Sequence, residues 1–333
     1  MSDDALRYYT PGIPNGWFQV AYVDDLDGSA VLPLKYFGKD LVLFRTESGE
    51  ISLLDAFCPH LGAHLGHGGK VKGESIECPF HAWQFNTGGQ CTAVPYAKHM
   101  PRKAELQRYP TRVVAGLVLA WYHAEGKPPE WEVATEVPEW GTVDGVRNEE
   151  WTEFERRRWK IKTRNQEMAE NQVDSAHFHY VHGTQNMPES NATAEGPIMR
   201  VYSGAGMETP RGKVDGSIES LAYGFGVAMV RFKGLAETLV ISTTTPIDAE
   251  YVDVRFHFSV KKMGGKSITQ GVGKAFMDEV CRQLEQDIPI WENKMQWERP
   301  LLCDGDGPIA LFRRWSKQFY SYPAGAAPSE AAE

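Results

Sequence analysis

Three absences limit what this chain of 333 residues can be. No stretch of apolar residues approaches the roughly 20 that a membrane-spanning helix needs. Lys and Arg number 35 against 44 Asp and Glu, a net charge of −9, whereas nucleic-acid-binding proteins usually carry a basic surface. The sequence therefore argues against a membrane-spanning protein and against a nucleic-acid partner. A local cationic patch that faces a protein partner stays compatible with this charge.

Cysteine is also scarce, with five in the chain, an odd number. Cys91, Cys281 and Cys303 show no spacing typical of a disulfide framework, and reduced thiols are the rule in the cytoplasm. The acidic residues 1–4 are not followed by an apolar segment, so we expect no secretory signal. We therefore predict a cytoplasmic protein of about two domains, with a disordered tail at residues 326–333.

What the chain does have is a pair of short Cys/His segments. The first clip is Cys58-Pro59-His60 and the second clip is Cys78-Pro79-Phe80-His81. Two cysteines and two histidines suit a [2Fe-2S] cluster of the Rieske type, in which histidines replace two cysteines on one iron. A structural zinc site is the alternative, but such sites usually place both cysteines in one segment and both histidines in the other. The mixed clips favour the Rieske cluster.

The region around the clips reads as β-structure. Residues 41–44 and 51–54 are apolar and flank a turn at Ser48-Gly49-Glu50, which predicts a hairpin. Residues 113–121 are almost entirely apolar and predict one more buried strand. His64, His67 and His99 are not placed by the motif, and we expect them at the surface or beside the ligands. The clips then lie on loops at one end of an all-β domain, where function is usually found.

The second half begins with a strand over residues 151–162 and a helix-forming stretch over 165–182. His177 and His182 lie five residues apart, so on a regular helix they point about 140° apart. They can share a metal only if the helix tightens or ends between them, and Gly183 is a natural helix end. From spacing alone, His179 paired with either histidine is nearly as good, and histidines of the core are an equal alternative.

A third ligand is predicted from a long helix over residues 272–297. Apolar side chains recur on one face of this helix, and Asp287 falls inside that apolar stripe. A buried carboxylate is costly unless it is paired or bound to a metal, so a buried salt bridge is the alternative. Residues 217–233, 238–245 and 251–261 predict strands of an antiparallel sheet, and residues 183–215 predict mobile loops near a pocket mouth.

These motifs resemble the Rieske non-haem iron oxygenases. The similarity rests on C-P-H-L-G-A-H-L-G-H-G, C-P-F-H-A-W and D-x-x-H-x4-H, and the residues 287–294 and 300–309 resemble the 3-ketosteroid 9α-hydroxylase branch. The resemblance implies an α+β protein: an all-β Rieske domain (1–125) followed by a helix-grip catalytic domain (126–325). It implies that the ligands of the cluster are Cys58, His60, Cys78 and His81. It also implies that the ligands of a mononuclear Fe(II) are His177, His182 and Asp287.

The resemblance also implies a reaction. Electrons pass from NADH through a separate flavin-containing reductase, directly or through a ferredoxin, to the cluster and then to the mononuclear iron, which uses O2 to hydroxylate a steroid-like substrate. Asp174 is then expected to orient His177 and to meet the counterpart of His81 in a neighbouring subunit of a homotrimer. A sterol desaturase, an aromatic-ring dioxygenase, and a non-enzymatic Rieske electron carrier with a lipid-binding domain are the alternatives.

Overall fold

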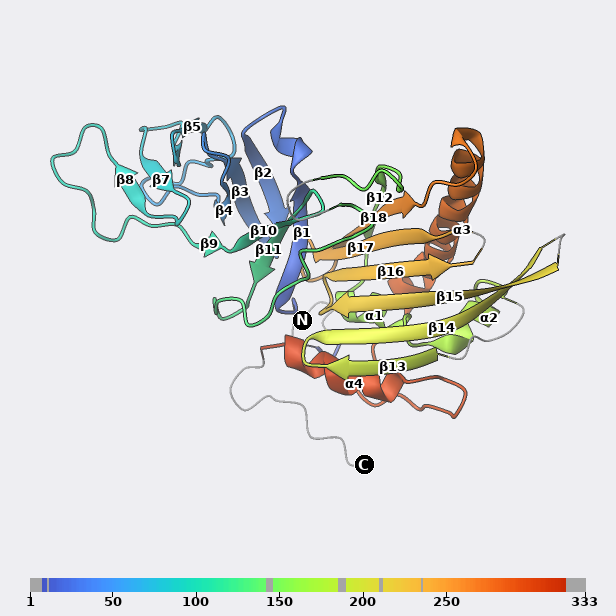
Figure 1. The fold of residues 1–333 in the computed structure, drawn as a ribbon. Coiled ribbons are helices and arrows are strands. Elements are labelled where there is room, and N and C mark those ends of the chain that lie inside the picture. Colours follow the sequence, from blue (N-terminus) through green and yellow to red (C-terminus); the bar gives the residue numbers. More distant parts are fainter. Residues whose placement is uncertain are drawn as a thin grey trace.

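The computed structural model describes residues 8–10, 12–141, 146–184, 190–209, 212–234 and 236–321. Figure 1 shows a first half built from small sheets beside a second half built on one large sheet with helices. The predicted tail at residues 326–333 lies outside the described residues. No helix among the described residues is both long enough and apolar enough to span a membrane.

The first half contains three antiparallel sheets. One has the order β1-β11-β10, one β2-β3-β4-β9, and one β5-β6-β7-β8. The strands are β1 (Gly16–Tyr22), β2 (Val31–Tyr36), β3 (Lys39–Arg45), β4 (Ile51–Asp55), β5 (Lys70–Lys72), β6 (Ser75–Glu77), β7 (Gln84–Asn86), β8 (Cys91–Ala93), β9 (Arg108–Tyr109), β10 (Thr111–Val114) and β11 (Leu117–Tyr122). The hairpin predicted at residues 41–54 is present as β3 and β4.

The prediction of one strand over residues 113–121 was wrong. The chain reverses at Ala115-Gly116, where both residues have positive φ, and β10 pairs with β11 as a hairpin. Ala115 has a φ of 49°, a left-handed conformation that favours glycine. Gly116 is therefore the one turn signal at this position, within an otherwise apolar run.

The second half is organised around a seven-stranded antiparallel sheet in the order β12-β18-β17-β16-β15-β14-β13. Its strands are β12 (Glu155–Ile161), β13 (Ser190–Glu195), β14 (Ile198–Thr209), β15 (Gly212–Tyr223), β16 (Val227–Lys233), β17 (Thr238–Pro246) and β18 (Val252–Val260). The helices are α1 (Asn165–Glu170), α2 (Ser175–Tyr180), α3 (Lys266–Asn293) and α4 (Ile309–Ser316).

Two further predictions for this half need correction. Residues 183–215 are not simply loops, because β13 and β14 form an edge hairpin of the sheet within them. Residues 217–233 are two strands rather than one, since the chain turns at Gly224, whose φ is 58°. The helical stretch over 165–182 is likewise divided into α1 and α2 by residues 171–174.

Alternate side chains of each strand point to opposite faces of the large sheet, and both faces are packed against other parts of the chain. In β18, Val254, Phe256 and Phe258 pack against Met277, Leu284 and Trp291 of α3. The intervening residues Asp253, Arg255 and His257 face the first half of the chain, where they bond to Tyr36 and Tyr22. Leu239 and Ile241 of β17 share a core with Trp17 and Leu119 on that same face.

Candidate metal centres

The two clips have the same backbone fold. The Cys58 amide donates to the Ala63 carbonyl at 2.9 Å, and the Cys78 amide donates to the Trp83 carbonyl at 2.8 Å. Within each turn a second bond runs back to the cysteine carbonyl, from Gly62 at 3.0 Å and from Ala82 at 3.1 Å. Gly62 and Ala82 both have positive φ. Matching turns therefore present the two cysteines and the following histidines from two neighbouring loops.

The clips bring like ligands together. Cys58 and Cys78 are buried in one core cluster, and burial, together with the neighbouring Cys78, raises the pKa of Cys58 to about 11. The rings of His60 and His81 lie 4.7 Å apart, and His60 stacks on Trp83. A pair of thiols beside a pair of imidazoles is the donor set of a Rieske cluster.

One atom in this region requires a partner. The Nδ1 atom of His81 is buried and has no hydrogen-bond partner in the described part of the chain. A buried polar nitrogen without a partner costs about 1–3 kcal/mol. Coordination to a metal would remove this cost and would also stabilise the thiolates, since a coordinating thiol is deprotonated. The residues present therefore fit a [2Fe-2S] cluster at the clips.

A second set of ligands lies between α2 and α3. Among the described residues, His177, His182 and Asp287 form the group whose ligand atoms all lie within 4.8 Å of one another. His182 Nε2 is 3.4 Å from Asp287 Oδ2, and both side chains are almost fully buried. Two histidines and a carboxylate with open positions are typical of a non-haem iron site that reacts with O2.

The end of α2 explains how His177 and His182 meet although they are five residues apart. α2 ends at Tyr180, and His182 lies beyond it, just before Gly183, whose φ is 73°. The two rings are 5.1 Å apart. His179 is directed elsewhere, because its Nδ1 atom bonds to the Thr184 carbonyl oxygen. The structure therefore groups His177 with His182 and leaves His179 outside the cluster.

Asp174 has a different contact from the one expected. Its carboxylate caps α2 by accepting from the amides of Ala176 and His177, at 3.1 and 3.3 Å. The Nδ1 atom of His177 instead lies 2.5 Å from the main-chain carbonyl oxygen of Asp174. The expectation that the carboxylate itself holds the ring N–H was wrong, since the main chain occupies that position. Within the described part of the chain, the other carboxylate oxygen makes no hydrogen bond.

Asp287 lies on the buried side of α3, only 6% exposed. Burial lowers the pKa of His182, but the adjacent Asp287 carboxylate and a bond to Gln286 outweigh it, so the pKa of His182 is raised. Burial is the main cause that lowers the pKa of His177. A carboxylate beside two imidazoles is a donor set that suits a divalent cation.

Gln286 is a residue that the sequence reasoning missed. Its side-chain oxygen Oε1 lies 3.1 Å from His182 Nδ1. When Nδ1 carries the proton, Nε2 has its lone pair free and faces Asp287. Partners of this kind fix the tautomer and orientation of metal-binding histidines. The signal was available, because Gln286 adjoins Asp287 on the helix.

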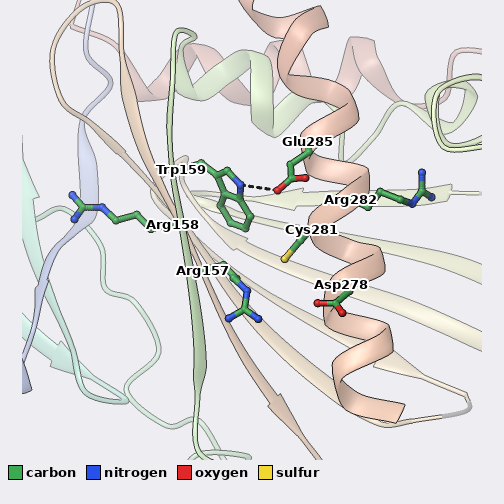
Figure 2. A pocket seen from close by; sticks show the side chains of 7 residues that line it. All are labelled: Arg157, Arg158, Trp159, Asp278, Cys281, Arg282 and Glu285. Atoms are coloured by element: carbon green, nitrogen blue, oxygen red, sulfur yellow. Dashed lines mark hydrogen bonds between the residues drawn. The ribbon is translucent and has the colours of Figure 1, made fainter. Parts of the chain in front are cut away.

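The groove drawn in Figure 2 is not part of this site. It has a volume of about 300 Å³ and lies between β12 and α3. Glu285 in the groove bonds to Trp159, while Asp287, two residues further, points about 160° away around the helix. Its arginines are paired with carboxylates, Arg157 with Glu155, Arg158 with Asp253 and Arg282 with Glu279.

Comparison with known families agrees with these two centres. A model of the Rieske [2Fe-2S] domain matches residues 16–110, and a model of the 3-ketosteroid 9alpha-hydroxylase C-terminal domain matches residues 120–320. The chain belongs to the Rieske oxygenases. It is therefore an enzyme, and its cofactors are a Rieske [2Fe-2S] cluster and a mononuclear iron in the catalytic domain, as the sequence predicted.

Curated relatives place this Rieske oxygenase beside sterol-modifying enzymes. It is 31% identical over 320 residues to the oxygenase component of 3-ketosteroid-9-alpha-monooxygenase from Rhodococcus rhodochrous, with 92% of this chain and 80% of the relative covered. It is 30% identical over 342 residues to cholesterol 7-desaturase nvd from Xenopus laevis, with 93% and 72% covered. The predicted resemblance to the 3-ketosteroid 9α-hydroxylase branch is thus confirmed.

Solved structures support the predicted fold class of the Rieske oxygenase. Dicamba monooxygenase bound to dicamba superposes with a TM-score of 0.68 at 17% identity, covering 92% of this chain and 97% of that one. The NdmA QL mutant with caffeine, from Pseudomonas putida CBB5, gives 0.69 at 20% identity, with 90% and 89% covered. An all-β Rieske domain followed by a large antiparallel sheet with helices is therefore the fold of this chain.

Proposed function

We propose that this Rieske oxygenase is the terminal component of a multicomponent system that hydroxylates a steroid-like apolar substrate. Electrons come from NADH through a separate flavin-containing reductase, directly or through a ferredoxin. The observation that carries the proposal is the buried group of His177, His182 and Asp287, in a chain whose second half matches the 3-ketosteroid 9alpha-hydroxylase C-terminal domain.

The proposed roles of the site residues follow from their contacts. Cys58, His60, Cys78 and His81 hold the cluster, and His177, His182 and Asp287 hold the mononuclear iron. When bound, the cluster supplies electrons one at a time and the iron supplies the chemistry of O2 activation. The chain's own contribution is to exclude water by burial, to hold both histidines with Nδ1 protonated, and to provide one negative charge from Asp287.

A homotrimer is proposed from the separation of the two centres. Figure 1 shows β7, which follows the second clip, and its neighbour β8 at the end of the molecule far from α2. Electron transfer within one chain would have to cross both halves. We therefore propose that the clips of one subunit meet the α2 region of the next subunit, where Asp174 bridges to His81 of the first.

The proposed domains are residues 1–125 and 126–325, and the proposed location of the protein is the cytoplasm.

Desaturation is the second candidate, because the similarity to cholesterol 7-desaturase is about as strong as that to the steroid monooxygenase. A desaturase would use the same centres and remove two hydrogens from the substrate. An aromatic-ring dioxygenase would add both oxygen atoms. A Rieske electron carrier with a lipid-binding domain would leave His177, His182 and Asp287 without iron.

The test combines metal analysis with product analysis. Three irons per chain are expected for an oxygenase and two for an electron carrier. Single-turnover reactions of the chemically reduced enzyme with O2, a panel of steroids and a panel of aromatic acids then identify the product by mass. A gain of 16 mass units indicates hydroxylation, because one oxygen atom is added. A loss of two hydrogens, or turnover of an aromatic acid alone, contradicts steroid hydroxylation.

A further inference from the structure

The outer end of the Rieske domain differs in charge from the rest of the chain. Residues 56–107, which contain both clips and the loop described next, have five Lys and Arg against three Asp and Glu, a net charge of +2 in a chain of −9. Three of the five cations are Lys98, Arg102 and Lys103. They lie on one segment between β8 and β9, residues 94–107, which we call the cationic loop. An acidic protein therefore has a positive surface at this end of the molecule.

The central part of the cationic loop is exposed to solvent. Each residue from 95 to 103 is exposed, including the apolar side chains of Tyr96 and Met100, which are 61% and 51% exposed. Figure 1 shows the loop projecting from β8 at the outer edge of the domain. Lys98, Arg102 and Lys103 make no ion pair or hydrogen bond with another side chain in the described ranges. Their charges are therefore available to a partner.

The loop is also tied to the cluster ligands. The Trp83 Nε1 atom donates to the Tyr96 hydroxyl at 2.8 Å, and Trp83 stacks on His60. The Tyr96 ring lies 6.4 Å from the ring of His81. Val94 and Leu106, at the two ends of the loop, are buried in the core cluster that contains both cysteines. A protein bound to the loop would thus lie beside the cluster, on the side of Trp83 and His60.

We propose that the cationic loop is the docking surface for an acidic electron-transfer protein that reduces the Rieske cluster. The inference rests on the proposed function, because it gives the cluster its electron donor. One electron would pass from the reduced donor to the oxidised cluster, with no bond made or broken. Opposite charges steer two proteins together and raise the association rate roughly 10- to 1000-fold.

The composition of the loop favours a transient donor over a second copy of this chain. Lysine is depleted from the cores of stable interfaces, which are enriched in apolar and aromatic residues. Electron-transfer encounters have small contact areas and depend on charge for their rate. A loop with two lysines, an arginine and two exposed apolar side chains suits the second kind of contact.

The test uses a plant-type [2Fe-2S] ferredoxin, a small acidic protein, as the probe. The potential of such ferredoxins lies below the range of Rieske centres, so electrons pass to the cluster. The variant reverses the three charges, Lys98→Glu, Arg102→Glu and Lys103→Glu. The control reverses three other exposed cations of the same types far along the chain, Lys262→Glu, Lys266→Glu and Arg314→Glu.

Two quantities are measured at low and high salt: the Kd for oxidised ferredoxin and the rate of cluster reduction by reduced ferredoxin. At about 10 mM salt, where screening is weak, we expect the loop variant to have an at least tenfold higher Kd and an at least tenfold lower rate of cluster reduction. In the control, each quantity should change less than twofold. Above about 0.5 M salt the wild type should approach the variant. Photoreduced deazaflavin, a small uncharged reductant, should reduce the cluster equally in all three proteins.

The outcomes separate this proposal from the proposed function. A wild-type protein without a Rieske spectrum contradicts the proposed function itself. A normal Rieske spectrum together with no ferredoxin binding, or with equal losses in the loop variant and the control, overturns only the docking surface. A loop variant that changes oligomeric state in sedimentation velocity also overturns it, because the loop would then belong to a contact between copies.

Discussion

Replacement of Gln286 by leucine should weaken metal binding although Gln286 is not a proposed ligand. In the wild type, the Gln286 side-chain oxygen lies 3.1 Å from His182 Nδ1, and the His182 side chain is 2% exposed. Leucine has a similar volume but no acceptor. In Gln286→Leu, the Nδ1–H group would be left without a partner, or the proton would move to Nε2, the atom that faces Asp287.

The expected size of the effect follows from burial. A buried donor without a partner costs about 1–3 kcal/mol. If this cost falls on the state in which Nε2 is free to bind, metal affinity decreases by roughly 5- to 150-fold, using 1.4 kcal/mol for each factor of ten. Loss of a hydrogen-bond partner of a metal-binding histidine typically costs 10- to 100-fold in affinity. The two independent ranges agree.

The assay is competition with a coloured chelator for Fe(II) under anaerobic conditions. Gln286→Glu keeps an acceptor and should bind iron within a few-fold of the wild type. The matched control is Gln283→Leu on the same helix, because the Gln283 side chain bonds to Glu279 and not to a histidine. Equal iron affinity in Gln286→Leu and Gln283→Leu would refute the argument that this bond sets the state of His182. The Rieske spectrum should be unchanged in all three variants.

Four other variants test the remaining assignments. Cys58→Ser should abolish the visible and EPR signals of the Rieske cluster and leave the mononuclear iron, and an unchanged spectrum would contradict the clips as ligands. Asp287→Ala should lose the mononuclear iron and turnover while the Rieske spectrum survives, and full iron content would point to another carboxylate. Asp174→Asn should keep both metals, the trimer and the helix cap, since Asn is as good a cap as Asp. In this variant, reoxidation of the reduced cluster in the presence of O2 and substrate should be slower than in the wild type, and reoxidation at the wild-type rate would exclude a bridging role. Burial lowers the pKa of His257 to about 3, so this ring stays neutral in the folded protein, whereas in the unfolded chain it takes up a proton below about pH 6.5. The free energy of unfolding should therefore decrease as the pH falls, by about 2 kcal/mol at pH 5. His257→Gln should lose this part of the pH dependence in urea titrations, and an unchanged pH dependence would disprove the assignment.

The sequence predicts the parts of this fold that have strong periodic patterns. The long helix was predicted at residues 272–297 and is observed at Lys266–Asn293, with Asp287 buried as the apolar stripe required. The stripe is reliable because it repeats over many turns of one helix. The hairpin of β3 and β4 was equally clear, since its turn contains Gly49, which has a φ of 95°.

The failures come from segments in which tertiary contacts override local signals. The turn at Ala115-Gly116 lies inside an apolar run, and a single glycine without polar neighbours is a weak turn signal. The edge strand β13 has the sequence SNATAE and is mostly exposed, because pairing with β14 on one side is sufficient to hold it. Asp174 was expected as a side-chain partner of His177, but a short helix that begins at Ser175 uses the nearest carboxylate as its cap.

One strand links the two centres in the fold. Alternate residues of β18 pack against α3, which carries Asp287, and the residues between them bond to the Rieske domain. Asp253 accepts bonds from Tyr36, Arg158 and Arg255, and burial raises its pKa less than these partners lower it, so the carboxylate stays charged. Of these three partners, only Tyr36 belongs to the Rieske domain, so hinge opening would break its bonds to Asp253 and Arg255. Hydrogen bonds to charged groups contribute about 1.5–3 kcal/mol each, and opening would also expose the core that Trp17 and Leu119 share with Leu239. The cluster of one chain is then held at a fixed separation from the metal-binding helix of that same chain. In the trimer that we propose, a second subunit would provide the short electron path, with no need for a domain movement.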